Sequence, residues 1–78
     1  MERRFDVPVR IAIGNVLYDV ANARQAIDLL INKWPSRRGP KYHEARKLCV
    51  ATLERKRSMT MARLAFLDAA REAGILVG

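Results

Sequence analysis

Apolar and polar residues alternate along the N-terminal part of the chain. Every second residue from position 5 to position 13 is apolar: Phe5, Val7, Val9, Ile11 and Ile13. This is the period of a strand with one buried face. The Gly14-Asn15 pair that follows favours a two-residue turn, because glycine adopts the positive φ that a tight hairpin requires. The pattern therefore predicts an antiparallel β-hairpin over about residues 5–20.

The register of the hairpin follows from the position of its turn. With Ile13 opposite Val16, the further pairs are Ile11 with Tyr18, Val9 with Val20, and Arg10 with Asp19. The apolar pairs share one face and the charged pair lies on the other, which is the pattern of a stable antiparallel ladder. We therefore expect the apolar face to pack against the rest of the chain.

Three helices are predicted after the hairpin, over about residues 22–34, 40–56 and 59–73. The first begins at Asn22, because Asn22 and Gln25 have the spacing of a capping box. Its apolar residues recur at helical spacing: Ala23, Ala26, Ile27, Leu30, Ile31 and Trp34. Pro35 disfavours helical geometry at Trp34 and ends the helix. We expect Trp34 to anchor this last turn on the hairpin.

The second helix starts at Gly39-Pro40, because proline at the first helical position loses no donor that the helix needs. Its buried side is expected to comprise Tyr42, Ala45, Leu48, Cys49, Thr52 and Leu53. The helix is expected to close in Arg55-Lys56-Arg57, where cations suit the helix dipole.

The third helix is capped by Ser58 or Thr60. Its apolar stripe consists mostly of small residues, which let another helix approach closely: Ala62, Ala65, Phe66, Ala69, Ala70 and Ala73. Gly74 is expected as a left-handed C-cap, with Ile75 folding back on Ala70.

These elements define an α+β fold, in which an N-terminal two-stranded antiparallel hairpin precedes three helices (ββααα) in a single small domain over residues 1–78. A core of this size supplies only about 3–5 kcal/mol of stability. We therefore expect contacts with a protein partner or with a second copy, as a homodimer. The open edges of the hairpin and the small-residue stripe of the third helix are the surfaces that favour such contacts.

Several short motifs occur in a characteristic order along nearly the whole chain: Phe5-x-x-Pro8-Val9, Trp34-Pro35 with Gly39, Ala45-x-x-x-Cys49, Ala62-Arg63-x-Ala65-Phe66 and Ala69-Ala70-x-Glu72-Ala73. In these features the chain resembles domain of unknown function 982, a family of short, mainly rhizobial bacterial proteins. The resemblance implies a small α+β domain and brings no activity or catalytic residue. The run Glu54-Arg55-Lys56-Arg57 departs from the family pattern, which has a glycine and a neutral turn there.

The residues that could carry out catalysis are few and scattered. Cys49 and His43 are the only cysteine and histidine, and six residues apart on one helix they point about 240° apart around its axis. Cys49 is therefore expected to be a small buried hydrophobe. Seven of the eight acidic residues are expected as solvated ion pairs: Asp6, Asp19, Asp28, Glu44, Glu54, Asp68 and Glu72. We expect no enzyme, no cofactor and no metal site.

The longest uncharged apolar run near the N-terminus, Ile11 to Tyr18, is far shorter than the roughly 20 residues of a membrane span. We therefore expect no membrane insertion. The single cysteine excludes an internal disulfide and fits a reducing, cytoplasmic setting.

The net charge of +7 is concentrated between Lys33 and Arg57, a segment that contains nine basic residues and two acidic ones. Clustered cations release counterions when they meet phosphates, which favours nucleic-acid binding without base specificity. The candidate polyanion-binding residues are Arg37, Arg38, Lys41, Arg46, Lys47, Arg55, Lys56 and Arg57.

The sequence therefore favours a non-enzymatic domain that acts through protein contacts or self-association. A basic nucleic-acid-binding accessory protein is the alternative, and a solubilising role for the same charge has comparable weight. A third, weaker hypothesis is a small-ligand or enzymatic pocket under Trp34 and Tyr42.

Overall fold

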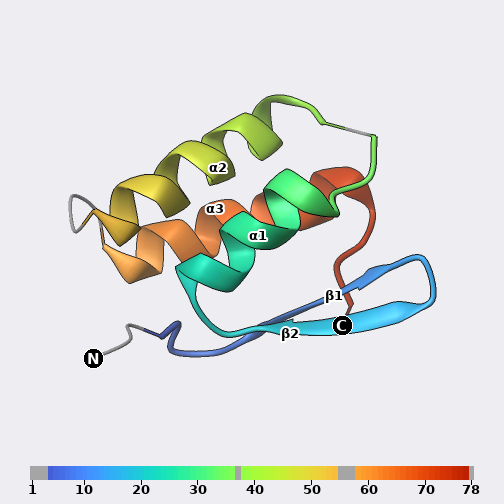
Figure 1. Cartoon of the computed structure of the whole chain (residues 1–78), viewed down its shortest axis with the longest axis horizontal. Coiled ribbons are helices and arrows are strands. Elements are labelled where there is room, and N and C mark those ends of the chain that lie inside the picture. Colours follow the sequence, from blue (N-terminus) through green and yellow to red (C-terminus); the bar gives the residue numbers. More distant parts are fainter. Residues whose placement is uncertain (1–3, 37, 55–57, 78) are drawn as a thin grey trace.

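The computed structural model describes residues 4–36, 38–54 and 58–77. Its elements follow in the order β1 (Val9–Ile13), β2 (Val16–Val20), α1 (Ala23–Asn32), α2 (Pro40–Leu53) and α3 (Met59–Ala73). Figure 1 shows the hairpin on one side and all three helices on the other. The predicted α+β fold, a hairpin followed by three helices, is confirmed.

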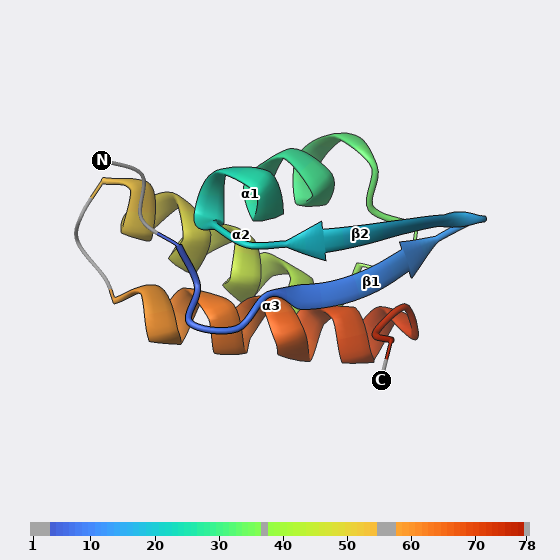
Figure 2. The same ribbon diagram turned by 90° about the horizontal axis from the view of Figure 1, so that it is seen from below.

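The helices cover one face of the hairpin in two tiers. Seen from below, α1 lies on the β2 side of the hairpin and α3 on the β1 side (Figure 2). The second helix packs on both of the others, most closely on α3, and lies farthest from the strands (Figure 1). The other face of the hairpin is left without a covering element among the described residues.

The hairpin has the register that the turn predicts. Val9 pairs with Val20, Ile11 with Tyr18 and Ile13 with Val16, and Gly14 in the turn has a φ of 61°. On the opposite face, Arg10 Nε donates to Asp19 Oδ1 at 2.8 Å. The first strand begins at Val9 because Pro8 has no N–H to contribute to a ladder.

One edge of the hairpin is not open, contrary to expectation. After α3, Leu76 forms an isolated antiparallel bridge with Ile11. The N–H of Ala12 donates to the Ile75 carbonyl at 2.9 Å, and the N–H of Val77 donates to the Arg10 carbonyl at 3.0 Å. The C-terminal residues therefore cover the outer edge of β1.

The helix ends confirm the predicted capping residues. Asn22 Oδ1 accepts from the N–H of Gln25 at 2.9 Å, while Gln25 Oε1 accepts from the N–H of Ala21 at 2.7 Å. Ser58, rather than Thr60, caps α3. Gly74 has a φ of 72°, and the N–H of Ile75 donates to the Ala70 carbonyl as in a Schellman ending.

The second helix ends earlier than expected. It ends at Leu53, with Glu54 as its C-cap, and the predicted closure in Arg55-Lys56-Arg57 lies outside the described residues. The expectation that Leu53 and Ile31 are buried is wrong, since they are 47% and 44% exposed. Leu29, which the apolar stripe of the first helix omitted, is buried instead.

The core is formed between the helices and the apolar face of the hairpin. Trp34 lies just past α1, and its ring packs against those of Phe66 in α3 and Tyr42 in α2, with centroids 5.4 and 6.2 Å away. Its aromatic contacts are therefore with helices, whereas packing on the hairpin was expected. The small-residue stripe of α3 is buried inside the domain, so it is not a surface for a second copy.

Candidate functional site

The structure describes four of the eight residues predicted to bind a polyanion. Arg37, Arg55, Lys56 and Arg57 lie outside the described part of the chain. Of the other four candidates, Arg38 lies in the connection just before α2, and three lie in α2: Lys41, Arg46 and Lys47. All four are exposed, and their surroundings differ.

Arg38 has structural contacts. Its guanidinium carbon lies 5.0 Å from the centroid of the Tyr42 ring, and Nη2 donates to the Trp34 carbonyl at 3.2 Å. A cation over an aromatic face and a hydrogen bond to the carbonyl of the buried Trp34 both favour this side-chain position. Arg38 therefore links the end of the α1–α2 connection to the first turn of α2.

The start of α2 is capped by a residue from α3. Gly39 has no side chain to cap the helix, and Pro40 has no N–H. The two free N–H groups that follow, of Lys41 and Tyr42, donate to the two carboxylate oxygens of Glu72 at 3.1 and 3.2 Å. A carboxylate at a helix N-terminus satisfies these donors and suits the helix dipole.

Glycine at position 39 is a consequence of this cap. A Cβ there would lie 2.7 Å from Glu72 Oε2 and 2.9 Å from Glu72 Cδ. The φ of −94° at Gly39 is accessible to other residues, so the close approach of the carboxylate is what favours glycine. Sequence reasoning placed Glu72 among the solvated ion pairs, and that expectation is wrong.

The only cysteine is not available as a nucleophile in the folded chain. Cys49 is fully buried, and this burial raises the pKa of its thiol to about 12. His43 is exposed on the other side of α2. The prediction that the two side chains point to different faces is therefore confirmed, and a thiolate is disfavoured at neutral pH.

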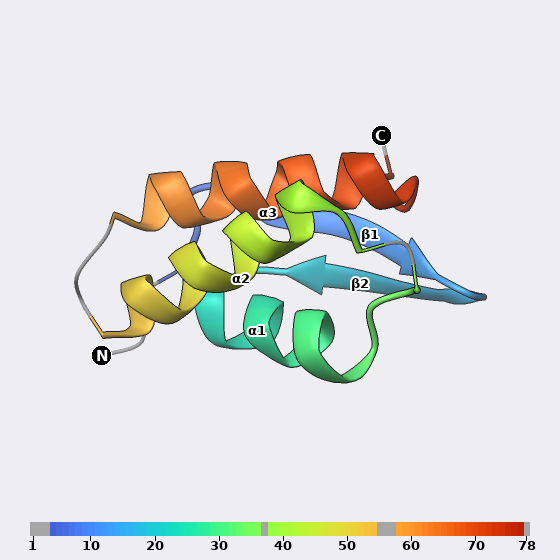
Figure 3. The same cartoon turned by 90° about the horizontal axis from the view of Figure 1, so that it is seen from above.

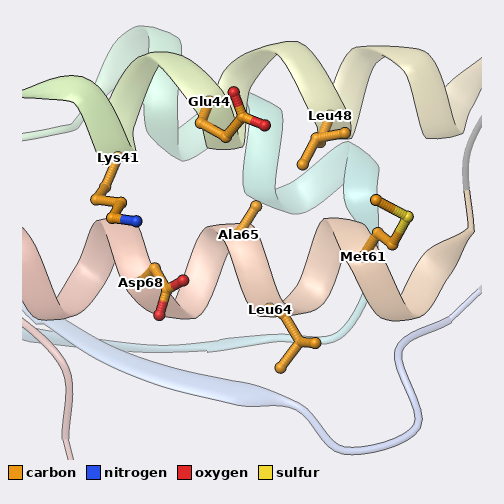
Figure 4. Close-up of a pocket in the computed structure, with 7 residues that line it drawn as sticks. All are labelled: Lys41, Glu44, Leu48, Met61, Leu64, Ala65 and Asp68. Atoms are coloured by element: carbon orange, nitrogen blue, oxygen red, sulfur yellow. The ribbon is translucent and has the colours of Figure 1, made fainter.

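The structure shows a shallow groove between α2 and α3 (Figure 4). Its lining residues are Lys41, Glu44, Leu48, Met61, Leu64, Ala65 and Asp68. Met61 and Leu64 are about half exposed, at 49% and 50%. Lys41 and Glu44 line this groove from α2, and Asp68 lines it from α3. Arg46 and Lys47 have no bonding partner among the described residues.

The outer edge of β2 has free backbone groups. In the hairpin register, Val16, Tyr18 and Val20 bond with β1, so the N–H and C=O groups of Leu17 and Asp19 point away from it. No partner for these outward groups is found in the described ranges. The Leu17 side chain is also 65% exposed, so this edge offers both backbone hydrogen bonds and apolar contact.

A groove of about 320 Å³ runs along the same edge, between β2 and α1. The strand contributes Leu17, Tyr18, Asp19 and Val20, and the helix contributes Gln25, Asp28, Leu29 and Lys33. Figure 3, which looks down on the helices, shows α1 beside β2 on the side away from β1. An exposed strand edge next to a helix is a geometry that can admit a further strand.

Comparison with known families identifies the chain. A family model described as a protein of unknown function (DUF982) matches residues 7–77. The chain belongs to this family. No curated protein and no solved structure matches it significantly.

Membership of the DUF982 family brings no known ligand to these surfaces. Within the described ranges, no group of three His, Cys, Asp or Glu side chains is placed to hold a metal ion. No described helix combines the length and the apolar character needed to cross a membrane.

Sequence reasoning missed two features of this DUF982 domain that bear on its sites. The first is the cap from Glu72, which the missing donor and missing side chain at Gly39-Pro40 could have indicated. The second is the strand-like pairing of the C-terminal residues, for which the apolar run Ile75-Leu76-Val77 after a helix-ending glycine was the available signal.

Proposed function

We propose that this DUF982 protein is a small non-catalytic protein-interaction domain that makes its contact through the open edge of β2. The observation that carries the proposal is the pair of outward backbone groups at Leu17 and Asp19, beside a Leu17 side chain that is 65% exposed. Unpaired strand edges join readily to other chains, and natural proteins usually cover or charge them. The covered edge of β1 illustrates this in the same hairpin.

The chemistry of the described residues supports a non-catalytic role. The thiol of Cys49 is buried and its pKa is raised to about 12, so the strongest potential nucleophile of the chain stays protonated. Tyr42 Oη donates to the Leu30 carbonyl at 2.8 Å in the core, which gives this hydroxyl a structural partner. The aromatic residues around Trp34 pack ring against ring.

Site-specific photo-cross-linking in cells of the source organism tests the proposal. A photoreactive amino acid replaces Leu17, and a matched control replaces Lys47, which is exposed on α2 far from the strands. We expect a protein adduct from position 17, with a second copy or another protein, that is absent or at least tenfold weaker from position 47. Equal adducts from both positions, or none from position 17, would contradict the proposal.

The alternative function is phosphate contact with nucleic acid, and one observation favours it. Arg46 and Lys47 are exposed neighbours on α2, and neither has a bonding partner among the residues that the structure describes. Such cations remain available for counterion release on a polyanion. This surface lies on the helix farthest from β2 (Figure 1), so the two functions use different sides of the domain.

Fluorescence anisotropy with duplex and single-stranded oligonucleotides at several salt concentrations tests this alternative. The variant Arg46→Glu/Lys47→Glu should weaken binding and reduce its salt dependence. The control variant Arg24→Glu/Lys33→Glu changes net charge equally at α1, in which Arg24 lies and after which Lys33 follows. Equal losses of affinity in both variants would indicate an effect of net charge alone. If the wild type does not bind oligonucleotides at low salt, this alternative is wrong.

A further inference from the structure

We infer that the groove between β2 and α1 binds an extended peptide segment of a partner protein, which adds to the hairpin as a strand beside β2. This inference rests on the proposed function and names the kind of partner that the edge accepts. The partner is identified by three properties of the groove: its free backbone groups, the position of α1, and the charges along it.

The backbone sets the length of the segment. The N–H and C=O groups of Leu17 and Asp19 offer four hydrogen bonds to one neighbouring strand. Beyond them, the N–H of Ala21 is bound to Gln25 Oε1 at 2.7 Å, and the Ala21 carbonyl accepts from the N–H of Phe5 at 2.6 Å. The stretch of β2 with available outward backbone groups is therefore short, and a peptide of about five residues spans it.

The position of α1 favours a single segment over the β2 strand of a second copy. Neighbouring strands lie about 4.8 Å apart, whereas packed helices need about 8–10 Å between their axes. Figures 2 and 3 show α1 beyond β2, on the side where the added strand would lie. Two-fold pairing of β2 with a second β2 would bring the two copies of α1 into the same space. The net charge of +7 on each copy also opposes this pairing.

An isolated peptide avoids that conflict because it brings no helix of its own. Its alternate side chains point toward α1, into the space lined by Tyr18, Val20 and Leu29. Tyr18 is half-buried and the other two are buried, so the floor of the groove is largely apolar. The central side chain of the segment should therefore be apolar.

Charges at the two ends of the groove define the flanking residues. Lys33 follows the end of α1 and lines the groove together with Leu17, and no bonding partner for its ammonium is found in the described part of the chain. Asp28 lies five residues earlier, and its one bond within the described ranges is at Oδ1, which accepts from Asn32 Nδ2 at 2.9 Å. An acidic residue of the peptide should lie near Lys33, and a basic residue near Asp28.

The order of these charges in the peptide reports its direction. Because α1 runs back along β2 (Figure 1), Lys33 lies toward the start of β2 and Asp28 toward its end. A segment antiparallel to β2 therefore has the pattern basic-x-apolar-x-acidic, in which every second side chain faces α1. A parallel segment has the reverse order.

Selection from a displayed library of random eight-residue peptides against the full chain tests the inference. We expect enrichment of peptides in which a basic, an apolar and an acidic residue occupy alternate positions. In ¹⁵N-labelled protein, the bound peptide should shift the amide signals of Leu17 and Asp19 most strongly. Signals that shift mainly on α2 and α3 instead would overturn the inference, because they would place the peptide in the other groove.

Two variants test the role of the edge directly. Leu17→Pro removes an N–H that the hairpin itself does not use, whereas Leu17→Ala keeps this donor and shortens the side chain. We expect Leu17→Pro to weaken peptide binding at least tenfold and Leu17→Ala to weaken it less. Lys33→Glu changes no backbone group and should shift the selected residue at the acidic position to Lys or Arg. Equal binding by wild type and both Leu17→Pro and Lys33→Glu would overturn the inference.

The remaining outcomes separate the inference from the function on which it rests. If no peptide binds but position 17 cross-links to a folded partner, the interaction domain stands and the extended segment is wrong. If sedimentation velocity shows a dimer that Leu17→Pro abolishes, the occupant is a second copy and the inference is overturned. If neither peptide nor cross-link is found, the inference and the proposed function fail together.

Discussion

The cap that Glu72 provides for α2 makes a prediction about coupling between two distant positions. Glu72→Ala removes the acceptors of two backbone N–H groups at a half-buried site. Loss of an N-cap side chain costs about 0.5–2 kcal/mol, and loss of a favourable charge at a helix N-terminus costs about 0.3–1 kcal/mol more. We therefore expect the free energy of unfolding to fall by about 2 kcal/mol.

Gly39→Ala should disrupt the same interaction from the other side. The added Cβ would lie 2.7 Å from Glu72 Oε2, so the carboxylate must move away from the helix. Since the φ of −94° suits alanine, the cost comes mainly from the lost cap and should also be about 1–2 kcal/mol. Once Glu72→Ala has removed the carboxylate, alanine at position 39 meets no obstacle from it.

Urea denaturation followed by circular dichroism measures this coupling in a double-mutant cycle. If one interaction explains both losses, the double variant should cost about 2 kcal/mol, well below the roughly 3–4 kcal/mol of independent effects. A loss of 2 kcal/mol corresponds to a fall in Tm of about 10 °C in a domain of this size. Glu44→Ala, which removes an exposed acid from the same helix, is the control and should cost little. Additive costs for Gly39→Ala and Glu72→Ala would refute the reasoning.

Three further predictions concern single contacts. Because burial raises the pKa of Cys49 from 9.0 to about 12, the unfolded chain loses this proton first as the pH rises, and the free energy of unfolding should fall by about 1.4 kcal/mol per pH unit between about pH 9 and 12. In denaturant titrations, a Cys49→Ala variant should lack this contribution to the pH dependence. Parallel pH profiles of the variant and the wild type would contradict the prediction. Val77→Pro removes the N–H that donates to the Arg10 carbonyl and should cost about 1 kcal/mol in urea denaturation, whereas Val77→Ala keeps the bond; equal costs would argue against the edge contact. Ser58→Ala should lower Tm by several degrees, corresponding to about 1 kcal/mol, while Thr60→Ala should change it little; the opposite ranking would place the cap at Thr60.

The features that the sequence predicted well are those decided by neighbouring residues. The hairpin register follows from a two-residue turn and an alternating pattern, so the pair Arg10–Asp19 could be placed without knowledge of the rest of the fold. The caps at Asn22 and Gly74 likewise depend on groups within five residues. Each of these interactions is complete within one element or one turn.

The features that sequence reasoning missed join residues far apart in the chain. Glu72 is 30 residues from Tyr42, and only the packing of α3 on α2 brings its carboxylate to the helix start. Leu76 reaches Ile11 because α3 ends beside β1. Trp34 could be predicted as buried, but its partners Tyr42 and Phe66 depend on how three elements meet. Periodicity identifies a buried face and does not identify the element that it contacts.

The two edges of the hairpin differ in whether they are available for pairing with another strand. The β1 edge is covered by the residues after α3, whereas none of the described residues pairs with the β2 edge along Leu17 and Asp19. A free edge usually invites pairing between copies and aggregation. Here α1 extends past β2 (Figure 3), so a second folded copy meets a helix while a single extended segment does not. In the binding mode that we propose, the helix that borders the groove is therefore also the element that opposes pairing between two copies of β2.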